Sequence, residues 1–345
     1  MKTTAQRWYI KFLQWKTQYL THRQFILLLC ALVGVATGFA ALAMRSLTHF
    51  IEEVLVGNII RYINYGFYVV FPAVGFLLVY LVKKYVIRKD VSHGIPSILY
   101  AVAKQKGIMK RFQAYGSLLT APITIGFGGS VGLEGPMVVT GAGISSQIAR
   151  LFHINQSDRM LLLACASAAA LAAIFKVPLA GILFAIEVFG LDLTLWSLLP
   201  LFVASLSGVL ISYLFFGNAA LLPIQVSGSF LMRNIPFYLL LGVVGGFMSA
   251  YFTFVYEWVN RFFARFSSPY VRLLIGGAVL GLLVFLMPPL YGEGHEVINH
   301  LKEGHPELSL GDNIFGWDLH NPWVIILLLA GLAFSKVVAT SVTFG

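Results

Sequence analysis

Glu134 is the residue whose type and surroundings most clearly suggest chemistry. It lies in the glycine-rich segment GGSVGLEGP of residues 128–136, between apolar stretches. A carboxylate within membrane-like sequence is costly and is therefore a functional candidate. Amides at a helix start favour its charged form and burial favours its neutral form, so its ionisation can be poised between the two. We expect Glu134 to occupy an anion position and to move away when protonated or displaced; the simpler interpretation is a carboxylate that only caps its helix.

A second segment, SHGIP of residues 92–96, also combines glycine with a following proline. Proline is favoured in the first turn of a helix, and glycine leaves the preceding backbone bare and able to adopt positive φ. Each segment therefore predicts a helix N-terminus with accessible N–H groups, which carries about half a positive charge and binds anions. Such partial charges hold an anion more weakly than a lysine would, and conduction requires that weakness.

The composition places these segments in a membrane protein. Hydrophobic residues make up 58% of the 345 residues and charged residues only 11%, which excludes an ordinary soluble domain. The net charge of +10 comes from Lys and Arg in short loops, as the positive-inside rule requires, so we expect no nucleic-acid partner. Cys30 and Cys165 lie inside apolar runs and are interpreted as small buried hydrophobes, with neither a disulfide nor a cofactor.

The apolar runs predict the elements that position the two glycine-rich segments. They cover roughly 25–44, 65–82, 113–133, 157–175, 177–191, 194–216, 235–256, 270–290 and 323–340. Several are too short, or too broken by Gly and Pro, to cross a bilayer of about 30 Å as simple helices. Non-helical backbone at membrane depth must be lined by protein or water. We therefore predict an all-α multi-pass membrane protein with broken and re-entrant helices around a site. Glycine pairs four residues apart would let helices approach closely in a compact bundle; they are Gly34 with Gly38, Gly242 with Gly246 and Gly277 with Gly281.

The loops predict how the chain is oriented. Residues 1–24 carry basic residues and regularly spaced aromatic residues but no acid, which predicts an amphipathic N-terminal helix on the cytoplasmic leaflet. The alternative is a cleavable signal peptide ending near Ala41-Leu42-Ala43. Basic loops at 83–89 and 104–111 are expected to be cytoplasmic, and the acidic segment 291–320 external. The expected location is the cell membrane, with a cytoplasmic N-terminus.

Three motifs, GLEGP at 132–136, HGIP at 93–96 and PLAGILFAIE at 178–187, resemble the CLC family of chloride channels and proton-coupled chloride antiporters. The resemblance implies a CLC-type inverted-repeat bundle with a first repeat at 25–216 and an incomplete second repeat at 230–345. It also implies a homodimer in the lipid bilayer with one chloride pathway per subunit, gated by Glu134. The implied anion-binding residues are His93, Gly94, Ile95, Pro96, Gly132, Leu133, Gly135 and Pro136.

The sequence departs from the family pattern at three places. His93 replaces the usual Ser; an imidazole could donate a hydrogen bond, narrow the pore, confer pH gating, or simply bond to backbone. Val188 stands where proton-coupled members carry the second carboxylate of IEE, so the internal proton-site position cannot hold a proton, which favours a channel-like protein. The chain also ends at Gly345, before the third Gly-x-Phe-x-Pro helix start and the coordinating Tyr, so we expect it to be truncated.

Two alternative functions are weighed against chloride passage. The first is a proton-coupled chloride or fluoride antiporter. The second and more remote one is an intramembrane hydrolase, but His295 and His300 are five residues apart, about 140° around a helix, and do not form a zinc pair. No nucleophile turn is present either, so we expect neither a metal nor an enzyme. Lys176, the other intramembrane charge, is expected at a helix end, with its side chain reaching the cytoplasmic vestibule.

Overall fold

The computed structural model describes residues 20–60, 66–89, 94–218, 231–305 and 321–345, and every regular element within them is a helix. Seven of these helical stretches are long and apolar enough to cross a membrane. They are His22–Ile59, Phe67–Ile87, Gln156–Phe175, Leu195–Phe216, Met232–Ala264, Pro269–Leu286 and Pro322–Phe344. The predicted class, an all-α multi-pass membrane protein, is confirmed.

The chain forms two compact units, and each consists of three segments that are separated in the sequence. Unit 1 comprises residues 1–45, 87–119 and 134–220, and unit 2 comprises 46–86, 120–133 and 221–345. These units are defined by packing, whereas the expected repeats at 25–216 and 230–345 concern internal symmetry. The division into repeats therefore stays a prediction. The expected amphipathic helix at 1–24 lies mostly outside the described residues.

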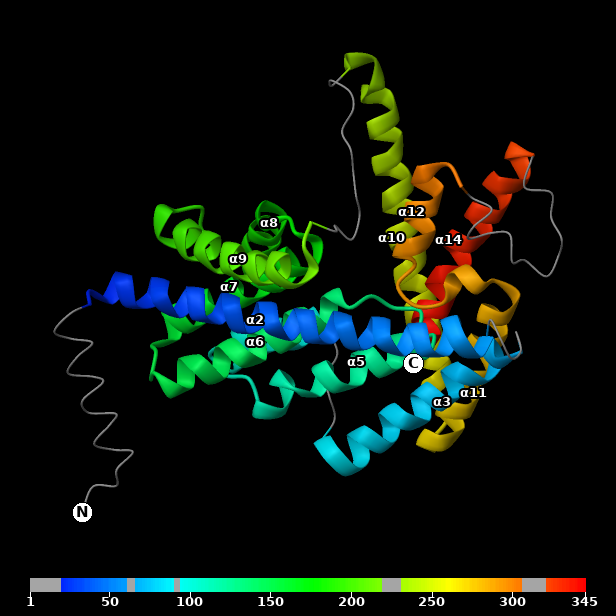
Figure 1. Ribbon diagram of the computed structural model, residues 1–345, viewed down its shortest axis with the longest axis horizontal. Helices are drawn as coiled ribbons and strands as arrows, with labels where there is room; N and C mark the ends of the chain where they lie inside the picture. Colours follow the sequence, from blue (N-terminus) through cyan, green and yellow to red (C-terminus); the bar gives the residue numbers. More distant parts are fainter. Residues whose placement is uncertain (1–19, 61–65, 90–93, 219–230, 306–320) are drawn as a thin grey trace. The chain divides into compact units, whose positions relative to one another are not determined.

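The helices of unit 1 are shown in Figure 1. They are the first part of α2 (His22–Glu52), α4 (Ile95–Lys104), the 3-10 turn η3 (Arg111–Ala114), the start of α5 (Gly116–Gly126), α6 (Glu134–Leu151), α7 (Gln156–Phe175), α8 (Pro178–Phe189) and α9 (Leu195–Phe216). Helix α7 packs against α6, α8 and α9, and most of its side chains are buried. It is therefore the core helix of this unit.

Small residues allow the helices of unit 1 to approach closely. A Cβ placed on Gly208 of α9 would lie 2.9 Å from the carbonyl oxygen of Ala169 in α7. The predicted pair Gly34 and Gly38 of α2 faces α9, where a Cβ on Gly38 would lie 3.0 Å from the Gly208 carbonyl oxygen. Close contacts of this kind are typical of membrane helices, which associate through packing rather than through the hydrophobic effect. Cys30, as expected, is buried in the same core.

The helices of unit 2 begin with the end of α2. They continue with the π-helix η1 (Glu53–Ile60), α3 (Phe67–Leu81), the π-helix η2 (Val82–Ile87), the 3-10 turn η4 (Met232–Asn234), α10 (Ile235–Ala264), α11 (Pro269–Leu286), the 3-10 turn η5 (Pro288–Leu290), α12 (His295–Glu303) and α14 (Pro322–Phe344). Helix α12 lies within the acidic segment 291–320 that the sequence analysis expected to be an external loop. That segment is thus partly helical.

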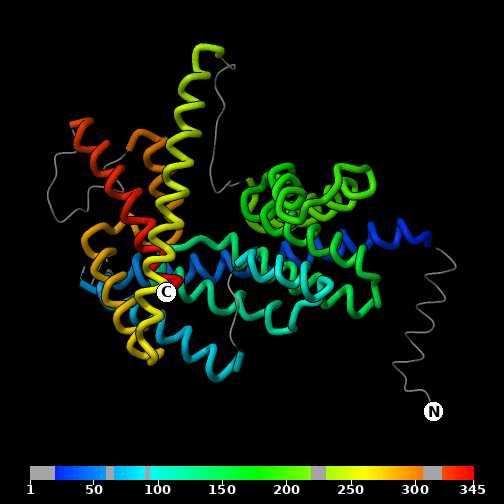
Figure 2. Tube along the Cα trace, turned by 180° about the vertical axis from the view of Figure 1, so that it is seen from behind, coloured from blue at the N-terminus to red at the C-terminus, as the bar shows by residue number. Residues whose placement is uncertain are grey.

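Two helix pairs build the core of unit 2. Helices α3 and α11 pack closely because a Cβ on Gly277 would lie 2.6 Å from the Cα of Ala73, and Gly281 lies against the backbone of Val69. Helices α10 and α14 pack against each other (Figure 2), with the rings of Tyr251 and Phe334 5.2 Å apart. Of the predicted small-residue pairs, Gly34 with Gly38 and Gly277 with Gly281 are thus confirmed as helix contacts.

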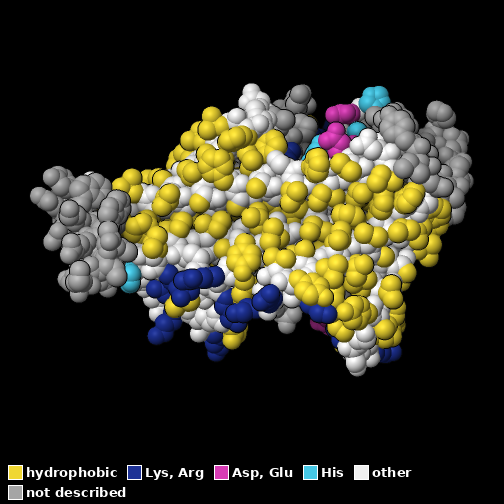
Figure 3. Space-filling view, turned by 60° about the horizontal axis from the view of Figure 1, so that its bottom comes forward, with side chains coloured by type: hydrophobic (Ala, Val, Ile, Leu, Met, Phe, Trp, Pro, Cys, Tyr) yellow, Lys and Arg dark blue, Asp and Glu magenta, His cyan; other side chains and the backbone are white. Residues whose placement is uncertain are grey.

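The outer helices expose hydrophobic side chains. The face shown in Figure 3 is covered largely by apolar side chains. In α9, Leu195 and Leu214 are strongly exposed, and in α10 the same holds for Leu239 and Phe247. A soluble monomer rarely exposes contiguous apolar surface of this kind, whereas helices in contact with lipid do so routinely.

Candidate functional site

Both glycine-rich segments end in helix N-termini, as the sequence analysis predicted. Helix α4 begins at Ile95, with Gly94 as its N-cap and Pro96 in its first turn. Helix α6 begins at Glu134, so that Glu134 is the acidic residue of its first turn. The N–H groups of a first turn have no partner within their own helix, and the positive end of the helix dipole lies there. His93 lies outside the described residues.

The two helix starts lie against each other in unit 1. A Cβ placed on Gly135, in the first turn of α6, would lie 3.8 Å from the Cα of Gly94, the N-cap of α4. Gly94 has φ 74° and ψ −173°, a backbone conformation that is essentially restricted to glycine. Because neither residue has a side chain, the backbones meet directly. The geometry thus joins two positive helix ends, and two such ends attract one anion more strongly than either alone.

Glu134 supplies a carboxylate in the first turn of α6, next to the contact between the two helix starts. It is half-buried, and Pro136 follows it within the same first turn, where the missing N–H of proline costs nothing. An ionised side chain at this position is stabilised by the helix dipole by about 0.3–1 kcal/mol, and by more when it is partly buried. A modest stabilisation of this kind allows another anion to compete with the carboxylate.

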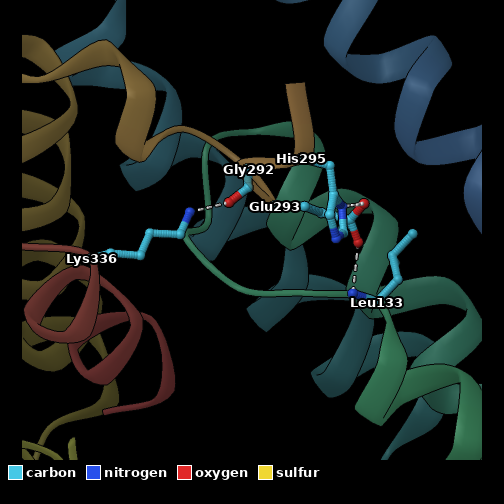
Figure 4. Close-up of polar contacts among 5 residues, drawn as sticks. All are labelled: Leu133, Gly292, Glu293, His295 and Lys336. Atoms are coloured by element: carbon cyan, nitrogen blue, oxygen red, sulfur yellow. Dashed lines mark hydrogen bonds and ion pairs between the residues drawn. The ribbon is translucent and has the colours of Figure 1, made fainter. Parts of the chain in front are cut away.

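Gly132 and Leu133 belong to unit 2, where a second carboxylate accepts a hydrogen bond from Leu133. The buried Leu133 donates its backbone N–H to Oε1 of Glu293 over 2.8 Å (Figure 4). The other carboxylate oxygen, Oε2, lies 3.3 Å from Nδ1 of His295. An amide that the sequence analysis assigned to the anion is therefore occupied by a carboxylate of this chain.

The loop that carries Glu293 docks along the segment that leads to Leu133. The Tyr291 hydroxyl donates to the Gly126 carbonyl oxygen over 2.5 Å, and Ser130 Oγ donates to the Leu290 carbonyl oxygen over 2.6 Å. Burial, and next the charge of Glu52, raise the pKa of the Tyr291 phenol, so it remains a hydrogen-bond donor. Together with the Glu293 contact, these bonds tie segment 126–133 to residues 290–293.

Helix α14 forms hydrogen bonds to both segments of this contact, 126–133 and 290–293. Thr340 Oγ1 donates to the Ser130 carbonyl oxygen over 2.7 Å, and the Ser130 N–H donates to Thr343 Oγ1 over 3.2 Å. On the other side, Lys336 Nζ donates to the Gly292 carbonyl oxygen over 2.7 Å (Figure 4). The backbone on either side of the Leu133–Glu293 bond is therefore held by one helix.

Lys176 lies at a helix end as expected, and its side chain is buried. It follows α7, is 8% exposed, and donates through Nζ to the Gly217 carbonyl oxygen over 2.6 Å. The ammonium thus satisfies the carboxyl-terminal carbonyls of α9, where a cation also complements the helix dipole. Lys176 therefore caps α9 within unit 1.

Val188 lies in the last turn of α8, which ends at a left-handed Gly190. It is half-buried, and the neighbouring Glu187 is exposed. The role of this position as an internal proton site stays a prediction.

Sequence reasoning did not assign a role to Glu293 or Lys336. Glu293 counted only as one of several acids in the segment 291–320. The available signal was its setting, because Gly292-Glu293-Gly294 places a carboxylate between two glycines, much as Gly132-Leu133-Glu134-Gly135 does. The partner could not be read from the sequence, since Leu133 lies 160 residues away.

The family model of the voltage gated chloride channel matches residues 74–345, most of the chain. The chain belongs to this family, the CLC family that the three motifs indicated. Among curated proteins, it is 26% identical over 289 residues to a ClcB-like chloride channel protein of Ralstonia nicotianae, covering 79% of this chain and 66% of the relative. It is 27% identical over 299 residues to the H(+)/Cl(-) exchange transporter ClcA of Citrobacter koseri, covering 83% of this chain and 63% of the relative. The chain thus spans slightly less than two thirds of the length of these relatives.

Solved structures share the fold. A slow cyanobacterial Cl-/H+ antiporter matches with a TM-score of 0.73 and 18% identity, covering 93% of this chain and 74% of that structure. A CLC-type fluoride/proton antiporter matches with a TM-score of 0.68 and 22% identity, covering 92% of this chain and 77% of that structure. The helices described above are therefore arranged as in CLC transporters.

Proposed function

We propose that the protein passes chloride or a similar small anion across the membrane through a CLC-type pathway gated by Glu134. The observation that carries this proposal is the contact between the starts of α4 and α6 at Gly94 and Gly135. The anion is bound by backbone at Gly94, Ile95 and the segment 132–136, and Pro96 and Pro136 fix the first helical turns. His93 adds an imidazole beside Gly94 in the sequence.

The mechanism follows from the chemistry of helix starts. Each start offers N–H donors and about half a positive charge, which replace part of the hydration shell that the anion loses. The Glu134 carboxylate, which stands in the first turn of α6, competes with the anion for the same donors. When Glu134 is protonated it loses its charge and thereby its advantage at the helix start. The anion then enters, and because no full positive charge holds it, it also leaves.

A channel-like protein is the preferred form because Val188 offers no proton acceptor at the internal position. The second candidate is a proton-coupled antiporter of chloride or fluoride, and the similarity to the ClcA exchange transporter and to the two antiporter structures favours it. In either form the protein is a transporter and not an enzyme. We place it as a homodimer in the cell membrane, with the N-terminus and the exposed basic residues Lys104 to Arg111 on the cytoplasmic side.

The proposal is tested by anion efflux from liposomes that contain the full-length purified protein, with and without Glu134→Gln, while internal pH is recorded. The expected result is chloride efflux without proportional proton movement, and a higher efflux for Glu134→Gln because the competing charge is gone. Proton uptake in fixed ratio to chloride efflux would establish the antiporter instead. No anion flux from wild-type protein would refute the proposed function.

A further inference from the structure

The Leu133 amide is occupied by a carboxylate other than the proposed gate. Its N–H donates over 2.8 Å to Oε1 of Glu293, and Leu133 directly precedes Glu134 in the segment that we assign to the anion. A charge-assisted hydrogen bond to a carboxylate is about twice as strong as one between neutral groups. Any anion that uses this amide must therefore displace the Glu293 side chain.

The backbone around Glu293 is fixed while its side chain is able to leave. Gly292 and Gly294 have φ values of 60° and 84°, which favour glycine. Lys336 Nζ holds the Gly292 carbonyl oxygen at 2.7 Å, so the turn stays in place when the carboxylate moves (Figure 4). The side chain itself is 18% exposed, and the hydrogen bonds described for it are those with the Leu133 N–H and with His295. It can therefore swing without unfolding the loop.

Both acidic and basic groups act on the Glu293 carboxylate. The carboxylate of Glu52 interacts electrostatically with those of Glu293 and Glu296, and Lys336 is the cation that interacts with both Glu52 and Glu293. His295 lies 3.3 Å from the second carboxylate oxygen. Lys336 donates its hydrogen bond to the Gly292 carbonyl oxygen and not to the Glu293 carboxylate. The hydrogen bonds described for that carboxylate are those with the Leu133 N–H and with His295.

We propose that Glu293 is a second displaceable carboxylate of the anion pathway, which occupies the Leu133 amide until an anion takes its place. This inference rests on the proposed function and adds a competitor at the Leu133 amide that is distinct from Glu134. Its effect is to set the anion affinity at this amide. Removing the Glu293 carboxylate frees a donor and removes a like charge, so both changes act in the same direction.

The test is chloride titration by isothermal calorimetry of the full-length protein in detergent, for wild type, Glu293→Ala, Glu293→Gln and Glu296→Gln. Glu293→Ala is expected to bind chloride roughly tenfold more tightly, because the competing bond is worth about the 1.4 kcal/mol that a factor of ten represents. Glu293→Gln keeps an oxygen acceptor but loses the charge, so a smaller increase is expected. Glu296→Gln removes the same charge from an exposed neighbour and should change affinity less than about twofold.

The possible outcomes separate this inference from the function on which it rests. If wild type binds chloride and both Glu293 variants bind it equally or more weakly, Glu293 is a structural cap and the inference is wrong. An increase of the same size in Glu296→Gln would also overturn it, since general electrostatics would then explain the effect. If Glu293→Ala does not fold, Glu293→Gln decides. If no variant and no wild-type protein binds or passes chloride, the proposed function fails, and the inference fails with it.

Discussion

Gly94 and Gly135 meet backbone to backbone, because a side chain on Gly135 would begin 3.8 Å from the Cα of Gly94. Each residue belongs to a helix start, and the contact therefore joins two positive helix ends within one compact unit. The proposed anion site depends on this contact more than on any single side chain. Mutations that change the backbone here should affect anion passage, and mutations that change only packing elsewhere should not.

Gly94→Ala should impair anion flux beyond its effect on folding. The φ of 74° and ψ of −173° strain any residue with a Cβ by about 1–3 kcal/mol, so the start of α4 will shift. Gly217→Ala is the matched control, because Gly217 has a similar positive φ (φ 52° and ψ −143°) but lies at the end of α9 and not at a helix start. The midpoint temperature of thermal unfolding in detergent should fall in both variants. The rate of anion efflux from liposomes should fall at least tenfold only in Gly94→Ala. Equal flux in the two variants would contradict the assigned site.

Gly281→Val should destabilise the protein through the contact between α3 and α11. The added side chain would collide with the Val69 backbone, and overpacking of this kind costs about 1–3 kcal/mol. Gly242→Val is the control, since no atom of the described residues lies within 4 Å of a Cβ there. The measurement is the thermal midpoint of the detergent-solubilised protein. A midpoint for Gly281→Val that matches Gly242→Val would show that the helices do not pack as described.

Lys176→Met should lower stability and leave anion affinity unchanged. The ammonium donates to the Gly217 carbonyl oxygen over 2.6 Å, and a hydrogen bond from a charged group contributes about 1.5–3 kcal/mol. Lys104→Met removes an exposed positive charge and serves as the control. Unfolding midpoints and chloride titrations of both variants check the assignment. Weaker chloride binding at unchanged stability would contradict the capping assignment and would indicate that Lys176 attracts anions.

Val188→Glu should add proton movement to chloride movement. The position lies in the last turn of α8 and is half-buried, where a glutamate can take up and release a proton. Recording internal pH during chloride efflux measures the effect, and Val188→Gln controls for the polar side chain without the proton. If wild-type protein already couples the two ions in fixed ratio, the channel interpretation of Val188 is wrong.

The sequence was sufficient for the local features of the site. Glycine followed by proline predicted helix starts at Ile95 and Glu134, because these two residue types act on the backbone of their own turn. The same reasoning predicted that Lys176 follows a helix. What the sequence could not predict is which distant groups complete each feature. The carbonyls that Lys176 reaches belong to the end of α9, about 40 residues later.

The same limit explains the small-residue pairs and Glu293. Three glycine pairs with identical spacing were equivalent in the sequence, yet Gly34 with Gly38 and Gly277 with Gly281 contact a helix, and Gly242 with Gly246 meet no described atom within 4 Å. Spacing shows that a close approach is sterically allowed, and only the tertiary fold decides where it occurs. Glu293 likewise lay in a segment defined by its acidity, and its partner amide is set by the docking of residues 290–293 on segment 126–133.

Locating a bound anion tests the central claim most directly. Crystals of the full-length protein grown in bromide should give anomalous density in contact with the first-turn backbone N–H groups of α4 and α6, close to Gly94 and Gly135. Glu134→Gln should raise the occupancy of that peak, because the competing carboxylate is absent. Bromide peaks elsewhere in the membrane helices, with none at these two helix starts in either protein, would contradict the account.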